Sequence, residues 1–332
     1  MSPQDTKTQP QPLLLMPELK RRIWGGTGLD AIKDAQVEPG HDPIGEAWLA
    51  YDHSPVHASE GVAGTLAEHV QRDRAAWLGP SPEPGDGPVV PIMLKILDAA
   101  DDLSVQVHPS DTQVTPEQRA AGHRGKTESW VVLDASQDAH VLWGTKAPMD
   151  LAQARVAAGR GDLHRHLRRV PVHAGSIIHN PAGTVHAVGR GLRIFELQQA
   201  SDITYRLDDY GRQDAGGHLR ELHVEEGLRV SNLGGRGSPH PEVPAGAPDW
   251  TAAACEYYLL RDVPIRGAHE IAFARPGIRF VTVIEGEIQL DVPGGPARFG
   301  PLTYPATVAV PAVIASVTAH GNGRLMVSEA ST

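Results

Sequence analysis

The 332-residue chain is poor in cysteine and contains no long apolar run. Its single cysteine, Cys255, excludes an intramolecular disulfide framework and suits a reducing cytoplasm. No apolar run approaches the roughly 20 residues that a membrane helix needs, so no membrane partner is expected. The N-terminal apolar patch LLLM, residues 13–16, follows no basic region, which argues against a signal peptide. These absences predict a cytoplasmic protein.

Positive charge is also scarce. The chain has 30 lysines and arginines against 40 aspartates and glutamates, a formal net charge of -10. No basic stripe stands out, so a nucleic-acid partner is not expected. A small anionic substrate is compatible with this balance, because one local cluster of lysine and arginine is enough to bind a phosphate. The sequence does not indicate an oligomeric state.

Glycine, proline and histidine are abundant, with 35, 28 and 17 residues. Glycine and proline fall between short β-branched runs, a pattern typical of many short strands joined by turns. The sequence therefore predicts a mainly β sandwich or barrel. The expected strands in its first two hundred residues include 89–99, 103–108, 128–135 and 139–144. The expected helices are 65–79 and an insertion near 149–170, the latter interrupted by Gly159 and Gly161. Thr65 and Glu68 have the spacing of a capping box for the first helix, and Gly79 ends it.

A Gly/Pro-rich stretch at residues 236–248 is predicted to be a linker. It divides the chain into an N-terminal domain, residues 1–235, and a smaller all-β domain, residues 249–332. The smaller domain has strand-like segments without a set of polar residues suited to chemistry, and its Glu285 and Glu287 are expected on an exposed face. We expect this domain to be structural.

The segment LSVQVHPSD, residues 103–111, raises the first question about function. In a strand, side chains alternate between the two faces, so Ser104, Gln106 and His108 share one face until Pro109 ends the strand. Polar residues also stand at two further strand positions, where Glu128 follows Lys126 at the same spacing and His186 lies in the turn-to-strand segment PAGTVHAVG. Two imidazoles, a carboxylate and an amide suit a divalent metal. The alternative is that these are unrelated surface or hydrogen-bonded core residues, and spacing alone favours it.

Four segments resemble the type I phosphomannose isomerases of the cupin superfamily: PIMLKILDAADDLSVQVHPSD, GKTESWVVLDA, PAGTVHAVG and ELQQASDITYRLDDYGR. The likeness runs in order from about Arg22 to Leu228, and the length matches the short bacterial form. The resemblance implies a cupin (jelly-roll) barrel catalytic domain with a few helices, followed by a second, smaller cupin-like β domain. It also implies interconversion of mannose 6-phosphate and fructose 6-phosphate through an enediol(ate).

The resemblance assigns roles to individual residues of this chain. One zinc ion per chain would be held by Gln106, His108, Glu128 and His186. The implied active-site residues are Lys126, Glu196 and Arg206, and those facing the sugar phosphate are Ser104, Lys126 and Arg206. The general base stays open between Glu196, Lys126 and a metal-bound water.

Other interpretations are retained. Arg206 has a simpler explanation as an ion-pair partner of Asp202, Asp208 or Asp209, and Lys126 as a solvated strand-end lysine. His179 is expected to be a hydrogen-bonded strand or turn histidine more than a pocket residue. The competing functions are a metal-dependent cupin oxygenase and a non-catalytic sugar-binding cupin. An amide ligand argues against redox iron, and the intact ligand set with Lys126 and Arg206 argues against a binding protein.

Overall fold

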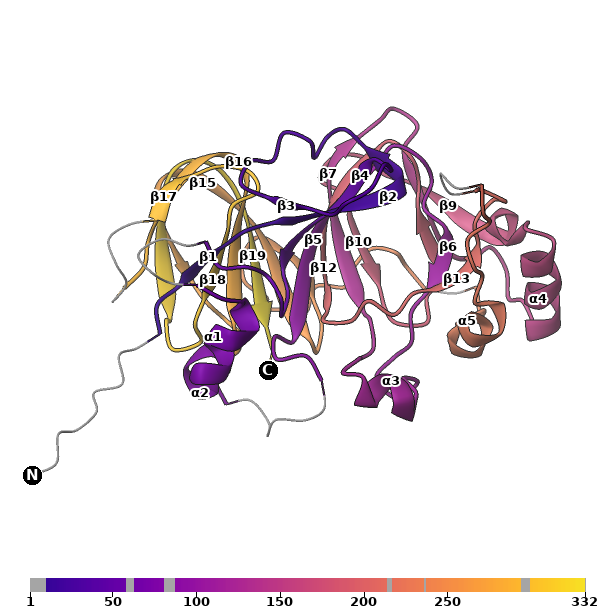
Figure 1. Ribbon diagram of the computed structural model, residues 1–332, viewed down its shortest axis with the longest axis horizontal. Helices are drawn as coiled ribbons and strands as arrows, with labels where there is room; N and C mark the ends of the chain where they lie inside the picture. The colour runs from indigo at the N-terminus through magenta and orange to yellow at the C-terminus, as the bar shows by residue number, and fades with distance from the viewer. Residues whose placement is uncertain are drawn as a thin grey trace, which may run out of the picture.

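Three β-sheets form the body of the computed structural model, with short helices at its edges (Figure 1). The structure describes residues 10–57, 63–80, 87–213, 217–235, 237–293 and 299–331. Within these ranges, no helix is long and apolar enough to cross a membrane. The predicted mainly β fold is confirmed.

Two of the sheets belong to the N-terminal part of the chain. The first has seven strands in the order β10 (Ile177–Asn180), β7 (Glu128–Ala135), β12 (Leu192–Gln199), β5 (Ile92–Ala99), β4 (Ile44–Ala50), β2 (Glu18–Gly26) and β3 (Gln36–Val37). The second has five, in the order β13 (Tyr205–Asp208), β6 (Val105–Val107), β11 (His186–Val188), β8 (His140–Thr145) and β9 (Leu167–Pro171). Apolar side chains from both sheets form one core between them, including Trp130 and Ile194 from the first sheet and Trp143 and Val188 from the second.

Side chains alternate along each strand, and this alternation decides which residues lie on each face of a sheet. On β12, Leu192 and Ile194 point into the core between the two sheets, whereas Phe195 and Leu197 point to the opposite face. Such a strand is buried on both faces and reads as almost continuously apolar. Glu196 interrupts the inward-facing series two residues after Ile194, so its carboxylate is directed between the sheets.

The third sheet lies mainly in the C-terminal part, at the left of Figure 1. Its strands are β1 (Leu13–Leu15), β18 (Thr307–Val310), β16 (Arg279–Asp291), β19 (Ser316–Ala330), β15 (Tyr258–Ala272) and β14 (Thr251–Ala254), with β17 (Phe299–Leu302) paired to β16. Strand β1 comes from the N-terminus and pairs with β18. Phe195 and Leu197 of β12 share one apolar cluster with Tyr258 and Phe280 of this sheet. The division at residues 236–248 stays a prediction.

The helices are shorter than the sequence pattern suggests. The predicted helix 65–79 forms as α1 (Leu66–Arg72) and α2 (Arg74–Leu78), separated by Asp73. The capping box of Thr65 and Glu68 and the end at Gly79 are confirmed. In the described part of the chain, the remaining helices are α3 (Pro116–Ala120), α4 (Leu151–Gly159), the 3-10 helix η1 (Leu163–His166) and α5 (Val224–Val230).

The expected helix near 149–170 breaks at Gly159, in agreement with the predicted interruption at Gly159 and Gly161, but its continuation to residue 170 is wrong. Helix α4 ends at Gly159, Gly161 takes a left-handed φ of 68°, and η1 follows. Strand β9 begins at Leu167, because its backbone pairs with β8. Sheet pairing therefore overrides the local helical pattern in this segment.

Candidate metal centre

One cross-strand row places three polar side chains of the five-stranded sheet together. Gln106 of β6 lies opposite His186 of β11 on one side and Arg206 of β13 on the other. The neighbours of these residues point outward into a separate apolar cluster that contains Val105, Val107 and Ala187. The alternation predicted around Gln106 is confirmed, and it turns the polar row towards the space between the two N-terminal sheets.

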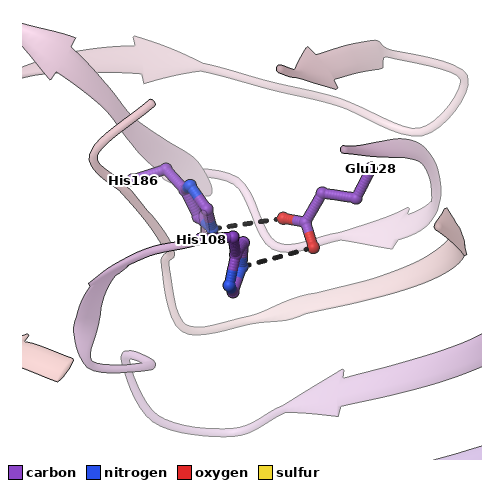
Figure 2. Close-up of side chains that lie close together, drawn as sticks. All are labelled: His108, Glu128 and His186. Carbon is purple, nitrogen blue, oxygen red and sulfur yellow. Dashed lines mark ion pairs between the residues drawn. The ribbon is translucent and has the colours of Figure 1, made fainter. Parts of the chain in front are cut away.

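His108, Glu128 and His186 form a compact buried cluster (Figure 2). Their ligand atoms all lie within 4.8 Å of one another, and each residue is at most 2% exposed. The Nε2 atom of His186 lies 3.1 Å from Glu128 Oε1, and the Nε2 atom of His108 lies 3.5 Å from Glu128 Oε2. The three residues therefore aim two ring nitrogens and one carboxylate at a common point.

Backbone carbonyls select the tautomer of both imidazoles. His108 donates its Nδ1–H to Ile203 O at 2.8 Å, and His186 donates its Nδ1–H to Thr184 O at 2.8 Å. In each neutral ring this leaves Nε2 as the acceptor, the arrangement usual for metal-binding histidines. Burial, followed by the charge of Lys126, lowers the pKa of His108 well below its ordinary value, so the ring is neutral at physiological pH.

The cluster fits a divalent metal by its donor set and by an unsatisfied atom. His108 Nε2 is buried and has no hydrogen-bond partner among the residues that the structure describes. A buried acceptor without a partner is costly, and a cation at the common point would satisfy it. Two imidazoles and a carboxylate also match the nitrogen and oxygen ligands of catalytic metal sites that keep an open position.

Gln106 lies at the edge of this cluster. Its side-chain Nε2 atom is 3.4 Å from His186 Nε2. The oxygen and nitrogen of an amide exchange places by a half-turn, and the hydrogen-bonding surroundings decide between the two. The half-turn directs the amide oxygen towards the same centre as the imidazole nitrogens.

Lys126 and Glu196 lie beside the cluster on its seven-stranded side. Lys126 Nζ is 3.0 Å from Glu128 Oε2 and 4.0 Å from Glu196 Oε1, and Trp130 donates its indole N–H to Glu196 Oε1 at 3.0 Å. Lys126 is 4% exposed, so the interpretation as a solvated strand-end lysine is wrong. Burial raises the pKa of Glu196 to about 8, with the Glu128 carboxylate adding to the effect and Lys126 opposing it.

Arg206 does not use the ion-pair partners considered from the sequence. Asp202 pairs with Lys95, Asp208 pairs with His164, and Asp209 pairs with two other arginines. The Arg206 guanidinium instead donates to Glu221 O at 2.8 Å. Its position in the row with Gln106 leaves it next to the candidate metal centre with no carboxylate within ion-pair distance in the described part of the chain.

The structure also places Ser104 and His179, two residues considered for the pocket from the sequence. Ser104 is buried, two residues before Gln106. His179 is hydrogen-bonded to Ser129 Oγ at 2.8 Å, which confirms the simpler expectation for this residue.

The sequence interpretation missed Lys95, Asp202 and Asn180. Lys95 is 3% exposed, pairs with Asp202 at 2.9 Å, and lies opposite Glu196 in the β5–β12 ladder. Asn180 donates from Nδ2 to Glu128 Oε1 at 3.3 Å and so orients that carboxylate. A lysine inside the apolar run PIMLKIL was the available signal for Lys95, since a charge in a fully buried strand needs a reason.

Comparisons with known proteins agree with this geometry. The family model described as phosphomannose isomerase type I, catalytic domain, matches residues 13–138. The mannose-6-phosphate isomerase ManA of Bacillus subtilis is 35% identical over 284 residues, which make up 83% of this chain and 86% of that protein. A mannose-6-phosphate isomerase of Streptococcus mutans is 34% identical over 227 residues, covering 68% of this chain and 69% of that protein.

A solved structure extends the agreement over almost the whole chain. The crystal structure of the mannose 6-phosphate isomerase from Bacillus subtilis matches with a TM-score of 0.81 at 27% identity, over 96% of this chain and 99% of that one. A putative mannosephosphate isomerase from Archaeoglobus fulgidus, at 20% identity, shares the fold with a TM-score of 0.73. With a buried His–Glu–His cluster on the matching fold and close relatives along most of its length, the chain belongs to the type I phosphomannose isomerases.

Proposed function

We propose that this protein is a zinc-dependent aldose–ketose isomerase that interconverts mannose 6-phosphate and fructose 6-phosphate. Its relatives of 34% to 35% identity carry the name mannose-6-phosphate isomerase. The observation that carries the proposal is the buried cluster of His108, Glu128 and His186 with Lys126 and Glu196 beside it. This is an inward-facing site with metal donors and proton-transfer groups in one place, as an isomerase needs.

The metal assignment gives one zinc ion per chain four ligands: Gln106, His108, Glu128 and His186. Bound there, zinc supplies a Lewis acid that stabilises negative charge developing on the sugar oxygens as the proton moves between C1 and C2. The chain itself fixes the ligands before substrate arrives. Ile203 O and Thr184 O hold the imidazoles, and Asn180 holds the carboxylate.

Proton transfer is assigned to Glu196 and Lys126. The indole N–H of Trp130 holds Glu196 Oε1, which leaves Oε2 to accept or return a proton. Lys126 is held between Glu128 and Glu196, and its ammonium group can donate to a developing enediolate oxygen. Glu196 in its carboxylate form can accept a proton directly, whereas Lys126 has to lose a proton before it can act as a base.

Arg206 and Ser104 are proposed to contact the sugar phosphate. The Arg206 fork carries a charge that no described carboxylate neutralises, and its place in the row with Gln106 directs it into the site. Ser104 is buried on the same side of the chain, two residues before Gln106. A hydroxyl group there can accept or donate to a sugar hydroxyl.

We further propose that the enzyme works in the cytoplasm on a small sugar phosphate, without nucleic-acid or membrane partners. The single cysteine and the formal net charge of -10 support this setting.

The test is conversion of fructose 6-phosphate to mannose 6-phosphate before and after chelation, with metal analysis of the purified protein. We expect close to one zinc per chain, loss of turnover on chelation, and recovery when zinc is returned. Iron without isomerisation would favour a cupin oxygenase. Sugar binding without turnover in the zinc-loaded protein would favour a binding protein.

A further inference from the structure

Three arginines gather around one buried aspartate at the end of β13, and one of them, Arg206, lies opposite Gln106 of the site. Asp209 follows β13 and is 5% exposed. It accepts from Arg212 in a short ion pair and from Arg220 Nη1 at 3.2 Å. Arg206, three residues before Asp209, is the third member. Guanidinium groups are cations and repel one another unless anions lie between them. A group of three arginines around one aspartate therefore needs further negative charge to be balanced.

The chain itself holds Arg220 beside Arg206. His223 donates its backbone N–H to Arg206 O at 2.7 Å, and Arg206 donates its own N–H to His223 Nδ1 at 3.2 Å. The Arg206 guanidinium also donates to Glu221 O. Residues 220–223 therefore run alongside β13, and the start of this segment carries Arg220.

Among the described residues, the carboxylates neutralise only part of the positive charge of the three arginines. Arg212 is paired with Asp209 and, at 3.5 Å, with Asp101, and it also donates to Asp102 O, so its position is structural. Arg220 shares Asp209 with Arg212. Arg206 has no described carboxylate within ion-pair distance, and its Nε atom is buried without a hydrogen-bond partner.

The pKa of Arg220 indicates the same excess of positive charge. Burial lowers the pKa of Arg220 to about 10; the charge of Arg206 adds to the effect, Asp209 opposes it, and Arg212 and Arg22 add further. An arginine pKa lowered by its neighbours means that the cations repel one another where they stand. An anion bound between Arg206 and Arg220 would relieve that repulsion and satisfy the Arg206 Nε–H.

We propose that Arg220 is a specificity-determining residue that binds the phosphate group of the sugar phosphate together with Arg206, and that Asp209 positions its guanidinium. The inference rests on the proposed function for the identity of the anion. Arg206 stands two strands from His186 across β6, a separation of about 10 Å at the usual strand spacing. A phosphate held at Arg206 and Arg220 thus leaves the other end of the sugar at the metal centre, where C1 and C2 react.

The test compares Arg220→Gln and Arg220→Lys with the unchanged protein, all zinc-loaded. For Arg220→Gln we expect KM for mannose 6-phosphate and the inhibition constant of inorganic phosphate to rise together by roughly 10- to 100-fold, the usual effect of losing a hydrogen bond to a charged group. We expect kcat and zinc content to change little. Arg220→Lys keeps the charge without the planar fork and is expected to fall between the two.

The matched control is Arg193→Gln, which removes an arginine of β12 that pairs with Asp134 outside the site. It should leave KM and the phosphate inhibition constant unchanged. The inference is overturned if both Arg220 variants retain the wild-type KM and phosphate inhibition.

Failure of the proposed isomerase function would give a different result from failure of the Arg220 assignment. In that case the unchanged protein would not isomerise the sugar phosphate, and binding of inorganic phosphate, measured by calorimetry, would take the place of KM. Weaker phosphate binding in both Arg220 variants would support the anion site even without isomerase activity. Unchanged phosphate binding would contradict it.

Discussion

Two of the proposed metal ligands, Glu128 and His108, are already in the protonation state in which they would bind a metal. The pKa of Glu128 lies well below its ordinary value: burial alone would raise it, but the charge of Lys126, the largest opposing effect, outweighs burial. The pKa of His108 is lowered by burial and by Lys126. A carboxylate and a neutral imidazole release no proton when a cation binds, so metal binding costs little at neutral pH.

Replacing either histidine should therefore remove metal and activity together. In His108→Ala or His186→Ala, we expect zinc affinity to fall by more than the roughly 10- to 100-fold that loss of an outer hydrogen-bond partner causes, with turnover falling in parallel. Metal analysis after dialysis and the isomerase assay measure both. His173→Ala, in an exposed turn, is the control. A histidine variant that keeps zinc but loses turnover would contradict the ligand assignment.

For individual residues, the sequence indicates which side chains belong to the site more readily than it indicates which side chains they contact. The alternation around Gln106 and the place of His186 at the start of a strand follow from local pattern, and the structure has both. Lys95 and Asp202 were missed as a pair because 107 residues separate them. No local rule brings β5 and the segment after β12 together, so their ion pair depends on the completed sheet.

Strand β7 connects the metal centre to the C-terminal sheet through its two faces. Glu128 and Trp130 face the site, whereas Ser129 between them faces Tyr258 of β15, whose hydroxyl lies 3.0 Å from Ser129 Oγ. Ser129 is also hydrogen-bonded to His179 of β10. All three side chains lie where the β7 sheet meets the C-terminal sheet, and Ser129 and Tyr258 are fully buried.

The Ser129–Tyr258 contact should contribute to stability and not to chemistry. Tyr258→Phe is expected to lower the free energy of unfolding by about 1 kcal/mol, the net value of one buried hydrogen bond, while zinc content and KM stay unchanged. Denaturant unfolding of Tyr258→Phe, Ser129→Ala and the double variant measures the coupling. If the two single effects simply add, the hydroxyl groups do not depend on each other and the expectation is wrong.

Elements were predictable where a local signal specifies them. Thr65 and Glu68 marked the start of α1 correctly, because a capping box satisfies the free N–H groups with side chains that are close in sequence. The break at Asp73 was missed: its side chain accepts from Ala76 N and starts a second helix where the apolar pattern continues. Likewise β9 replaced the expected helix, because its partner β8 lies more than twenty residues earlier.

At the scale of the whole molecule, charged side chains of β2, β4 and β5 form a network that reaches the metal centre. Glu46 of β4 is 9% exposed and receives hydrogen bonds from Arg22 at 2.9 Å and from Trp48 Nε1 at 2.6 Å. Lys95 lies over the ring of the same tryptophan, 4.6 Å from its centroid. This network joins β2, β4 and β5 and continues through Lys95 to Asp202, so it links three strands of one sheet to the site.

The Glu46 carboxylate should make stability depend on pH in the acid range. Burial alone would raise its pKa, but Lys95 and Arg22 outweigh burial, and the folded pKa lies below the ordinary value of 4.5. A group with a lowered folded pKa contributes stability that is fully present above its unfolded pKa. That contribution is lost as the pH falls below about 4.5 and through the folded pKa, because the unfolded chain takes up the proton first.

Glu46→Gln should accordingly be less stable than the unchanged protein at pH 7, and the difference should shrink towards pH 3.5. Urea unfolding from pH 7 to pH 3.5 measures it, with both proteins metal-free so that acid release of the metal does not contribute. Glu287→Gln, an exposed position of β16, is the matched control and should follow the unchanged protein at every pH. A constant gap between the Glu46→Gln and unchanged curves would mean that Glu46 acts through packing and hydrogen-bond geometry, and that its charge contributes nothing.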